Sequence, residues 1–561
     1  FKKPFMKKAL ALIVLSFLFT PMVKAQGFLS KSEVHGNFEL DGMYYQADDA
    51  LGITDSIING NEFGFNGFAD IIYTLGNFSA GLRYEAYLPP IAGFDRNLDG
   101  QGIANLWASY TTDRFSITIG DFYEQFGNGL TLRTYTEWSL GYDNALKGAR
   151  FVFSPIDGII LKGVYGVQRY FWTKYENNNR GIVKGFDAEI NLNDVFNGMS
   201  DSKIKLTLGG SAVSKYQSDQ NPFYKMPKNV AAFAGRFNLG INKFNFSSEY
   251  AYKINDPSAI NNYIYKPGAA FIFSGSYSTK GLGIYAQFKR VDNMSYKSDQ
   301  AVTSNALDIN FLPPLIEAHT YMLAAMYPYA TQPNGEIGFQ IAINYKVPKK
   351  SKIGGKYGMG VSINYSQMNN IDRSAPNDTA YIGQSGTMGW NSDFFKFGKQ
   401  IFNRDLTIEI DKKFNKKFKS TFKYIYQKYD IATIQGHTGE PIVNANIAII
   451  DMTYKLTSKK ALRWELQGLW TKEDKGDWAA ALIEYTVSPH WFVTITDQYN
   501  YGNKHINEKI HYYTGSFGYT LNTMRIALTY GRQREGVVCV GGVCRQVPAS
   551  NGFSLTISGS F

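Results

Sequence analysis

The strongest constraint on the fold of this chain is a strict alternation of apolar and polar side chains, in segments of roughly ten residues. From Phe78 to Leu88 every second side chain is apolar, and mostly polar or small residues lie between them. The same pattern recurs over 34–44, 63–75, 115–119, 205–208, 491–496 and 525–530, and a helical periodicity is nearly absent. Such alternation is typical of transmembrane β-barrel strands, which face lipid on one side and the lumen on the other.

The connections between these segments come in two lengths that alternate along the chain. Bacterial outer-membrane barrels have short periplasmic turns and longer extracellular loops, and a soluble β-sandwich has no reason to segregate its loops in this way. We therefore predict an all-β protein, a single large transmembrane antiparallel β-barrel. The expected short turns are 76–77, 112–114, 157–158, 241–243, 280–281, 458–460, 488–489 and 522–523, and the expected long loops are 48–61, 89–102, 122–146, 172–180, 217–227, 254–267, 293–317, 369–400, 429–440, 501–508 and 535–551.

The pattern predicts about 24 strands, with 22 or 26 as alternatives. Single-chain bacterial barrels have an even number of strands, yet a direct parse of this sequence gives an odd one. The conflict lies within 318–400, where 319–329, 337–347 and 359–367 all have strand patterns but their connections break the length rule. We expect one of the three to fold inward or to belong to a loop.

The N-terminus predicts a secretory signal peptide over residues 1–25, and the barrel is then expected over 26–561. Met6-Lys7-Lys8 precedes a short apolar run, a proline and the small residue Ala25, and residues 1–5 are expected to lie upstream of the true start. The net charge of +11 includes five lysines of this segment, so the remaining chain is only mildly basic and no nucleic-acid partner is expected. No second long apolar run follows, which excludes a helical membrane protein.

The last strand indicates where the barrel resides. Apolar residues alternate with serine and threonine in NGFSLTISGSF, and the chain ends on an aromatic residue. A closed barrel can end in this way, because its last strand pairs with its first. The terminal aromatic residue also resembles the signal that barrel-assembly machinery reads. We predict the outer membrane of a Gram-negative bacterium, with outer-membrane lipid and that machinery as partners, and as the insertion signal Phe553, Leu555, Ile557 and Phe561.

Two cysteines lie close together near the C-terminus. Cys539 and Cys544 flank Gly541-Gly542, which suits a two-residue hairpin turn and makes the cysteines a closely spaced cross-strand pair. Secretion implies an oxidising compartment, so we predict a disulfide that pins a loop tip. Metal binding is the weaker alternative, because no histidine is near.

The stretch 120–150 combines acids, cations, aromatics and glycines in one long loop. One interpretation is a loop folded into the lumen, where opposed charges form a constriction. The other is an extracellular loop whose charges pair with each other. Charges such as Arg83, Glu85, Lys289 and Lys423 on the inward faces of strands are compatible with a wet or paired lumen. The candidate constriction residues are Asp121, Glu124, Arg133, Glu137, Asp143, Lys147 and Arg150.

Asp95, Asn97 and Asp99 match the first half of a calcium-binding loop. Leu106 stands where such a loop needs its bidentate acid, so a polar turn with Asx hydrogen bonds is the favoured interpretation. We expect no cofactor, and calcium is the minority alternative.

The six histidines include no recognised catalytic motif. His505 and His511 are expected near an extracellular rim, and Asp497 on a neighbouring strand could approach them. A hydrolase at this rim is a third hypothesis, and rim histidines in a hydrated girdle are the simpler interpretation.

Three runs carry a resemblance to known sequences: 121–130, 143–150 and 327–336. In these runs, and over nearly all of the chain after its signal peptide, the sequence resembles an uncharacterised family of Bacteroidota-type outer-membrane β-barrel proteins with porin-like architecture. The resemblance implies a barrel and brings no substrate and no catalytic residues.

The first functional hypothesis is therefore a porin-like channel or transporter for an unidentified small solute, with 120–150 as its constriction. The second is a structural, assembly or secretion-associated barrel that docks an unidentified partner protein through its loops. The loop 369–400 is the candidate docking surface, since it carries Trp390, Phe394, Phe395 and Phe397.

Overall fold

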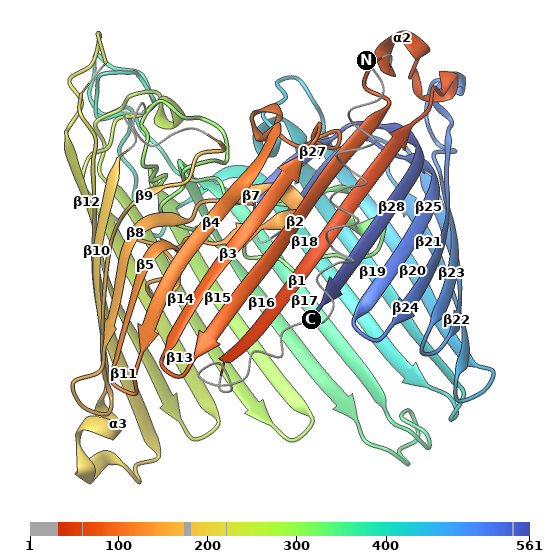
Figure 1. Ribbon diagram of the computed structural model, residues 1–561, viewed down its shortest axis with the longest axis horizontal. Helices are drawn as coiled ribbons and strands as arrows, with labels where there is room; N and C mark the ends of the chain where they lie inside the picture. The colour runs from red at the N-terminus through yellow and green to blue at the C-terminus, as the bar shows by residue number, and fades with distance from the viewer. Residues whose placement is uncertain (1–31, 59, 173–180, 220, 541–542) are drawn as a thin grey trace.

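The computed structural model describes residues 32–58, 60–172, 181–219, 221–540 and 543–561, so the expected signal peptide and the Gly541-Gly542 turn lie outside the described residues. Twenty-four antiparallel strands form one closed barrel, which confirms the predicted fold class and strand number (Figure 1). Within the described residues, no helix has both the length and the apolarity needed to cross a membrane.

The barrel strands follow one another in chain order, each paired with its neighbours. They are β1 (Ser32–Tyr45), β2 (Phe63–Leu75), β3 (Phe78–Tyr87), β4 (Gly100–Thr111), β5 (Phe115–Phe122), β8 (Leu146–Phe153), β9 (Ile159–Gln168), β10 (Ile182–Asn191), β11 (Ile204–Tyr216), β12 (Asn229–Ile241), β13 (Phe244–Lys253), β14 (Gly268–Thr279), β15 (Leu282–Asp292), β16 (Gly335–Val347), β17 (Met359–Ile371), β18 (Phe397–Lys413), β19 (Phe418–Asp430), β20 (Ile442–Lys455), β21 (Lys460–Trp470), β22 (Trp478–Val487), β23 (Trp491–Tyr499), β24 (His511–Leu521), β25 (Met524–Gln533) and β28 (Ser550–Ser560).

In the ranges that the structure describes, the connections hold short hairpins and helices. Two small hairpins lie outside the barrel wall, β6 (Thr136–Glu137) with β7 (Tyr142–Asp143), and β26 (Gly536–Val540) with β27 (Val543–Val547). The short helices are η1 (Asp49–Leu51), α2 (Asp55–Ile58), η2 (Arg96–Leu98), η3 (Trp138–Leu140), α3 (Leu192–Val195), η5 (Asn197–Met199), η6 (Ala259–Asn261), η7 (Ala324–Met326), α4 (Ile431–Ile434) and η8 (Ile506–Glu508).

The barrel closes where β1 pairs with β28. Leu40 lies opposite Ile557, and the backbone of Phe561 exchanges two hydrogen bonds with that of Gly36, at 2.9 and 3.0 Å. The Phe561 ring lies over Gly36, where an added Cβ would be only 2.3 Å from the ring. The terminal aromatic residue therefore fits a position that only glycine leaves open, and the sheet has no free edge.

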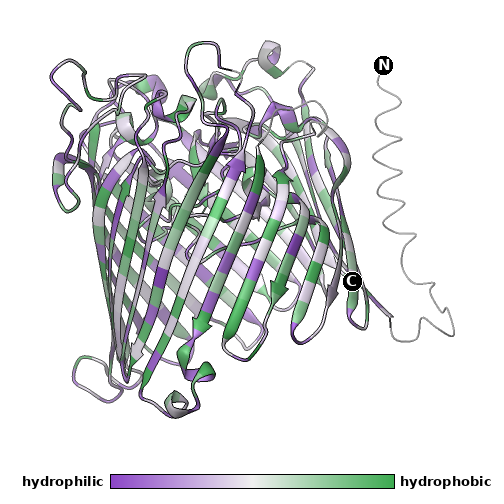
Figure 2. Ribbon diagram, turned by 90° about the vertical axis from the view of Figure 1, so that its left-hand side faces the viewer, coloured by the Kyte–Doolittle hydropathy of each residue, from purple (hydrophilic) through white to green (hydrophobic). Residues whose placement is uncertain are grey.

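Apolar and polar residues alternate along the barrel strands (Figure 2). Phe553 and Leu555 are each 41% exposed on the outer wall, and Phe561 is 59% exposed. The side chains between them belong to the inner face, where Thr556 donates a hydrogen bond to Asp41 of β1 at 2.6 Å. Three of the four residues predicted as an insertion signal are thus strongly exposed on the outer wall, and Ile557 is less exposed.

The two loop lengths also separate in space. The short turns and the chain terminus at Phe561 lie at one end of the barrel, and the long loops lie at the other (Figure 1). Two connections at the short-turn end are longer than expected, 192–203 with α3, and 348–358. In barrels of this kind the short-turn end is periplasmic.

The structure resolves the conflict over 318–400. The stretches 337–347 and 359–367 lie in β16 and β17, but 319–329 contains only the short helix η7. This segment has a strand-like pattern because Tyr321, Leu323 and Tyr327 fall on alternate positions. Leu323 packs in a buried cluster and does not face lipid. The expectation that one of the three candidates is not a strand is confirmed.

Candidate functional site

Three connections fold into the barrel instead of away from it. We name them the first inward loop (123–145), the second inward loop (293–334) and the disulfide loop (534–549). The first two contribute buried side chains that pack on lumen-facing residues of the wall or on one another, and residues 544–546 of the disulfide loop line a cavity with both. These loops are the candidate functional site, because they decide what can pass through the barrel.

The apolar residues of the first inward loop pack on one side of the lumen. Phe126, Leu130 and Leu132 are fully buried. Their contacts come from inward-facing small and β-branched residues of the wall, which leave room for the loop. The small and β-branched wall residues in these clusters are Val164, Val183, Val213, Val230, Ala232, Ala251, Ala270, Ile272 and Val291.

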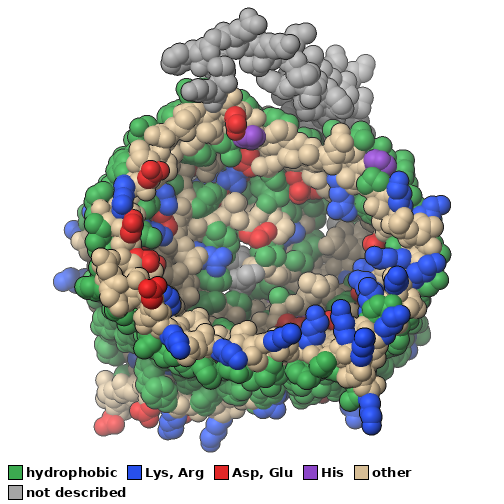
Figure 3. All heavy atoms as spheres, turned by 90° about the horizontal axis from the view of Figure 1, so that it is seen from below, with side chains coloured by type: hydrophobic (Ala, Val, Ile, Leu, Met, Phe, Trp, Pro, Cys, Tyr) green, Lys and Arg blue, Asp and Glu red, His purple; other side chains and the backbone are tan. Residues whose placement is uncertain are grey.

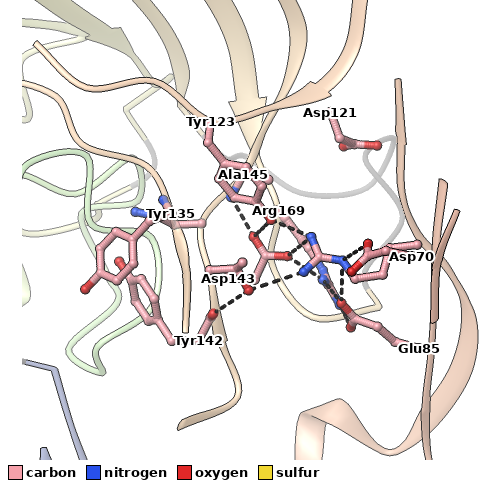
Figure 4. Close-up of polar contacts among 12 residues, drawn as sticks. Asp70, Glu85, Asp121, Tyr123, Tyr135, Tyr142, Asp143, Ala145 and Arg169 are labelled. Carbon is pink, nitrogen blue, oxygen red and sulfur yellow. Dashed lines mark hydrogen bonds and ion pairs between the residues drawn. The ribbon is translucent and has the colours of Figure 1, made fainter. Parts of the chain in front are cut away.

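A buried network of charges ties the first inward loop to β3 (Figure 4). Arg169, which directly follows β9, donates to both carboxylate oxygens of Glu85, at 2.6 and 3.0 Å, and to Asp143 at 2.7 Å. Arg83 of β3 lies 3.5 Å from Glu85 and 3.6 Å from Asp143, and it donates to the Tyr123 hydroxyl at 2.6 Å. Both arginines are at least nine-tenths buried, so each depends on these partners for its charge.

Burial and neighbouring charges shift the pKa values of Tyr123 and Arg169 in this network. Burial raises the pKa of the Tyr123 hydroxyl, and the neighbouring Asp143 raises it further, so this hydroxyl stays a donor and bonds Asp143 at 3.0 Å. Burial alone would lower the pKa of Arg169, but Asp143 and Glu85 raise it above its ordinary value. Asp143 also accepts the Ala145 amide at 2.9 Å, which anchors the loop where it rejoins β8.

The structure brings only part of the predicted constriction set into the lumen. Glu124 is buried and pairs with Arg150 at 2.6 Å and with Lys162 at 3.0 Å. Arg133 stacks over the rings of Phe311, at 3.9 Å, and Tyr135. These contacts join the loop to the wall and to the second inward loop.

The other predicted residues have different surroundings. Glu137 accepts hydrogen bonds from the Ser139 amide and hydroxyl and so begins the short helix η3. Asp121 accepts the Leu106 amide at 2.8 Å, beside the irregular backbone of Gly120, which has a φ of +107°. Lys147 is exposed on β8, on the same face as Ala149 and Phe151. That face is the outer wall, because parity along a strand decides the side.

The second inward loop begins on three buried wall lysines. Lys215 (β11), Lys253 (β13) and Lys289 (β15) are each no more than 1% exposed. Their ammonium groups donate to backbone carbonyls of the loop: Lys215 to Lys297 at 2.7 Å, Lys253 to Ser295, and Lys289 to Pro313 at 2.5 Å. Acids satisfy the same charges, Asp256 for Lys215 and Glu336 for Lys289.

The loop then crosses to the far side of the lumen. Glu317 pairs with Lys423 of β19 at 2.6 Å, His319 with Asp405 of β18 at 2.7 Å, and the Leu323 amide bonds Gln467 of β21 at 2.9 Å. Its apolar residues pack on inward-facing residues of β19 to β22 and β24, among them Ile425, Tyr429, Val443, Leu469, Trp478 and Tyr512. Since β11 and β21 stand on opposite sides of the 24-stranded barrel, the loop spans the lumen.

The sequence predicted a long loop over 293–317 and one segment of 318–400 that folds inward or belongs to a loop, but it did not predict that the two form one loop across the lumen, nor the buried His319–Asp405 pair. The alternation 319–329 was the misleading signal. Inward-facing charges such as Lys289 and Lys423 were visible, but nothing identified their partners as backbone carbonyls and Glu317.

The inward loops are bonded to one another. The Arg133 amide donates to Ile309 at 2.8 Å, and the Phe311 amide donates to Gly129 at 2.9 Å. In the disulfide loop, Cys539 and Cys544 form a disulfide, and the Cys544 carbonyl accepts Asn305 at 2.7 Å. A cavity of about 280 Å³ remains between the three loops, lined in part by Tyr87, Trp138, Tyr142, Asp143, Arg169 and Arg545.

The calcium candidates form a capped turn. Asp95 accepts the Asn97 amide at 2.9 Å, ahead of the short helix η2, as an Asx turn does. Across the described ranges, no group of three or more histidine, cysteine, aspartate or glutamate side chains is placed to hold a metal ion.

The histidines of the hydrolase hypothesis lie apart from any nucleophile. His511 bonds Asp497 at 2.6 Å and stacks on Tyr499, with ring centroids 3.9 Å apart. In the part of the chain that the structure describes, no hydroxyl or thiol group is bonded to the ring of His505 or His511. The geometry offers a base with an orienting acid but no partner for it to activate.

The aromatic loop 369–400 uses two of its aromatic residues in contacts with the outer surface of the barrel. Trp390 is 4% exposed and donates to Asp292, and Phe394 packs against Tyr250 and Phe271. Phe395 remains 70% exposed.

The chain is a closed outer-membrane-type β-barrel whose lumen its own loops occupy. It belongs to a family of unknown function (DUF6029), whose model matches residues 5–561. This finding agrees with the resemblance to an uncharacterised barrel family. No curated protein matches the sequence significantly.

Among solved structures, the chain is similar to the translocation pore of the P pilus usher PapC, with 10% identity, 94% of this chain and 99% of that chain covered, and a TM-score of 0.46. It is also similar to OccAB3 of Acinetobacter baumannii, with 10% identity, 95% and 99% covered, and a TM-score of 0.34. A ferric enterobactin receptor (PfeA) mutant from Pseudomonas aeruginosa has 11% identity, 94% and 80% covered, and a TM-score of 0.42. Similarity this low says nothing about function.

Proposed function

We propose that this protein is a gated channel or transporter for a small polar solute in the outer membrane of a Gram-negative bacterium, closed at rest by its inward loops. The observation that carries the proposal is the second inward loop, which spans the lumen from the buried lysines of one wall to Gln467 of the opposite wall. Passage through the barrel then requires this loop to move.

The size of the barrel supports the same proposal. Barrels with 16–18 strands leave an aqueous channel, and those with about 22 strands are usually plugged. An empty barrel of 24 strands would breach the permeability barrier, so its lumen needs an occupant. Seen from the short-turn end, the lumen is hollow, with chain covering much of its far side (Figure 3). A plug near the long-loop end, above an open vestibule, is suited to gated entry.

The chemistry of the loops supports a polar solute. The partly exposed Arg150 and Lys162 of the wall lie beside the first inward loop, where both pair with the buried Glu124. The cavity of about 280 Å³ between the three loops provides a first position for a small molecule that combines aromatic and ionic contacts.

Planar-bilayer conductance of the purified protein tests the proposal. We expect low conductance for the wild type, and large, persistent conductance when residues 294–333 are replaced by a short glycine–serine linker between β15 and β16. Removal of 124–144 alone is expected to give a smaller increase, because the second inward loop still spans the lumen.

A matched control shortens an outer loop, by removing residues 376–388, and is expected to leave the conductance as in the wild type. Folding of every variant is checked by the heat-modifiable electrophoretic mobility of the barrel. If a folded barrel that lacks both 124–144 and 294–333 still passes no current, the channel proposal is wrong.

A further inference from the structure

Three neighbouring turns at the short-turn end carry an unusual concentration of lysine. They connect β16 to β17, β18 to β19 and β20 to β21, so they adjoin one another along the rim. The ranges 346–358, 411–419 and 454–461 hold thirteen lysines and a single acid, Asp411. The lysines are Lys346, Lys349, Lys350, Lys352, Lys356, Lys412, Lys413, Lys416, Lys417, Lys419, Lys455, Lys459 and Lys460.

The charge of this patch is exposed and uncompensated. All of its lysines except Lys412 are exposed, and within the described residues none of the thirteen is ion-paired. The rim across the barrel differs, since Asp113, Asp157, Asp194 and Asp201 lie on its turns. Viewed from below, Lys and Arg side chains gather along one arc of the rim, and acidic side chains concentrate elsewhere (Figure 3).

The turns that carry the lysines have a defined structure. In the turn 348–358, the Lys350 amide bonds Gly355 at 2.6 Å, and the Ser351 hydroxyl bonds Pro348 at 2.7 Å. Lys412, from the next turn, donates to the carbonyls of Ile353 and Gly354, each at 2.8 Å. One lysine therefore joins two adjacent turns, and the other charges are held on an ordered surface.

A basin of about 540 Å³ opens between the first two of these turns, the end of β14 and the start of β15. Lys346, Lys413 and Lys419 lie on the lumen-facing side of their strands, by parity with Asn344, Asp411 and Thr421. All three line the basin, together with Tyr357, over whose ring Lys413 lies at 5.4 Å. The patch therefore continues from the outer rim into the mouth of the lumen.

We propose that this patch, which we name the lysine rim, binds an acidic polypeptide segment of a periplasmic partner protein. Its lysines extend over three turns, farther than a small anion could contact at once. They occupy one arc, whereas lipid surrounds the whole barrel. Lys346, Lys413 and Lys419 also face the wet mouth, where lipid headgroups do not lie. The inference does not rest on the channel proposal.

The test uses the full-length protein in phosphatidylcholine nanodiscs and a fluorescein-labelled peptide of alternating glutamate and serine, followed by fluorescence anisotropy. We expect salt-sensitive binding to the wild type. The triple variant Lys346→Gln/Lys413→Gln/Lys419→Gln is expected to bind about tenfold more weakly, because it removes three charge contacts of modest strength. A Lys→Arg triple variant at the same positions keeps the charge and is expected to bind like the wild type.

The matched control removes the same charge from the opposite end, as Lys228→Gln/Lys472→Gln/Lys504→Gln, three exposed lysines of long loops. It is expected to change the affinity less than about twofold, since contacts this far away are screened. Equal losses in both triple variants, or unchanged binding by the first, would overturn the proposal. Loss of peptide binding when phosphatidylglycerol replaces phosphatidylcholine would assign the lysines to lipid and would also overturn it.

Discussion

The first and second inward loops fill the same lumen but are held in different ways. The first is tied by its own side chains, such as Glu124 and Asp143, to cations of the wall and to Arg169. The second begins on buried lysines of the wall that donate to the Ser295, Lys297 and Pro313 carbonyls, and farther along its Glu317 and His319 pair with side chains of the wall. At the start of the second loop the charged anchors therefore belong to the barrel, whereas in the first loop they are side chains of the loop.

This difference explains why the start of the second inward loop has no charge pattern that marks it as folding into the lumen. A loop that binds through charged side chains must carry them, and 120–150 does. Every residue has a carbonyl oxygen, so a loop bound through carbonyls has no compositional signature. The predictions below compare how firmly the two modes of attachment hold a loop.

The largest effect is expected for Lys289→Met. This change removes the donor to Pro313 and Thr331 and leaves Glu336, which is fully buried, without its cation. Breaking a buried pair in this way costs about 4 kcal/mol. Hydrogen exchange of the backbone amides of 294–333 is expected to speed up strongly, while that of the first inward loop changes little.

The control is the double variant Lys289→Met/Glu336→Gln. It removes the unpaired charge but leaves an acceptor for the Tyr329 hydroxyl and the Gln332 amide. We expect most of the exchange protection to return. If the double variant is as unstable as the single one, the contact to the Pro313 carbonyl dominates and the charge pair does not.

Arg169→Met is expected to destabilise the first inward loop, by less than Lys289→Met destabilises the second. The two-pronged contact with Glu85 and the bond to Asp143 are lost, but Arg83 remains 3.5 and 3.6 Å from these acids. We expect a loss of about 3 kcal/mol, at the low end for a buried pair, measured as faster exchange over 123–145. The variant Arg169→Lys should recover only part, because an ammonium group cannot reproduce the planar fork. An effect of Arg169→Met larger than that of Lys289→Met would reverse the comparison.

The sequence predicted the barrel well because the alternation of side chains follows directly from a wall with lipid on one side. Phe553, Leu555 and Phe561 are examples, since they fall on alternate positions of the sequence and all three are exposed on the outer wall. The same rule failed for 319–329, whose apolar residues face the interior of the lumen and not lipid. Alternation of apolar and polar residues shows that one side of a segment is apolar. It does not show whether that side faces lipid or the packed interior of the lumen.

The constriction set was predicted as a group by its charge, and the structure separates its members by geometry. Asp143 and Glu124 lie in the loop interior, whereas Lys147 faces outward on β8. A shift of one residue along a strand moves a side chain from the lumen face to the outer face. The sequence did not define the boundary between the loop 122–146 and its strands to within one residue. Partners far away in the chain, such as Glu85 for Arg169, leave no local signal at all.

The disulfide loop lies against both inward loops. Loss of its disulfide is expected to speed up hydrogen exchange less than Arg169→Met does and more than loss of a surface ion pair. Cys539 and Cys544 are five positions apart, and closing so short a loop stabilises it by about 2 kcal/mol in the chain-entropy estimate. In the variant Cys539→Ser/Cys544→Ser we expect faster exchange in 536–547. We also expect a weaker contact of Asn305 with this loop, and little change over 293–300. Treatment of the wild type with a reductant should reproduce the result, and equal loosening of both inward loops would contradict it.

The smallest effect is expected for the exposed ion pair between Glu535 of the disulfide loop and Lys475. The hydrogen bond and the charge of Lys475 lower the pKa of Glu535. The pair therefore stabilises the folded loop above the ordinary glutamate pKa of about 4.3, and this contribution disappears as the pH falls through the lowered value. Both side chains are more than one-third exposed, so we expect the pair to contribute less than about 1 kcal/mol.

The measurement is the hydrogen exchange of the backbone amides of 534–549 at pH 6 and pH 3, corrected for the intrinsic rate, in the wild type and in Glu535→Gln. Only the difference between the two proteins reports this pair, because other carboxylates titrate in both. Lys475→Gln should abolish the same difference, and an equal pH dependence in the wild type and in Glu535→Gln would contradict the prediction.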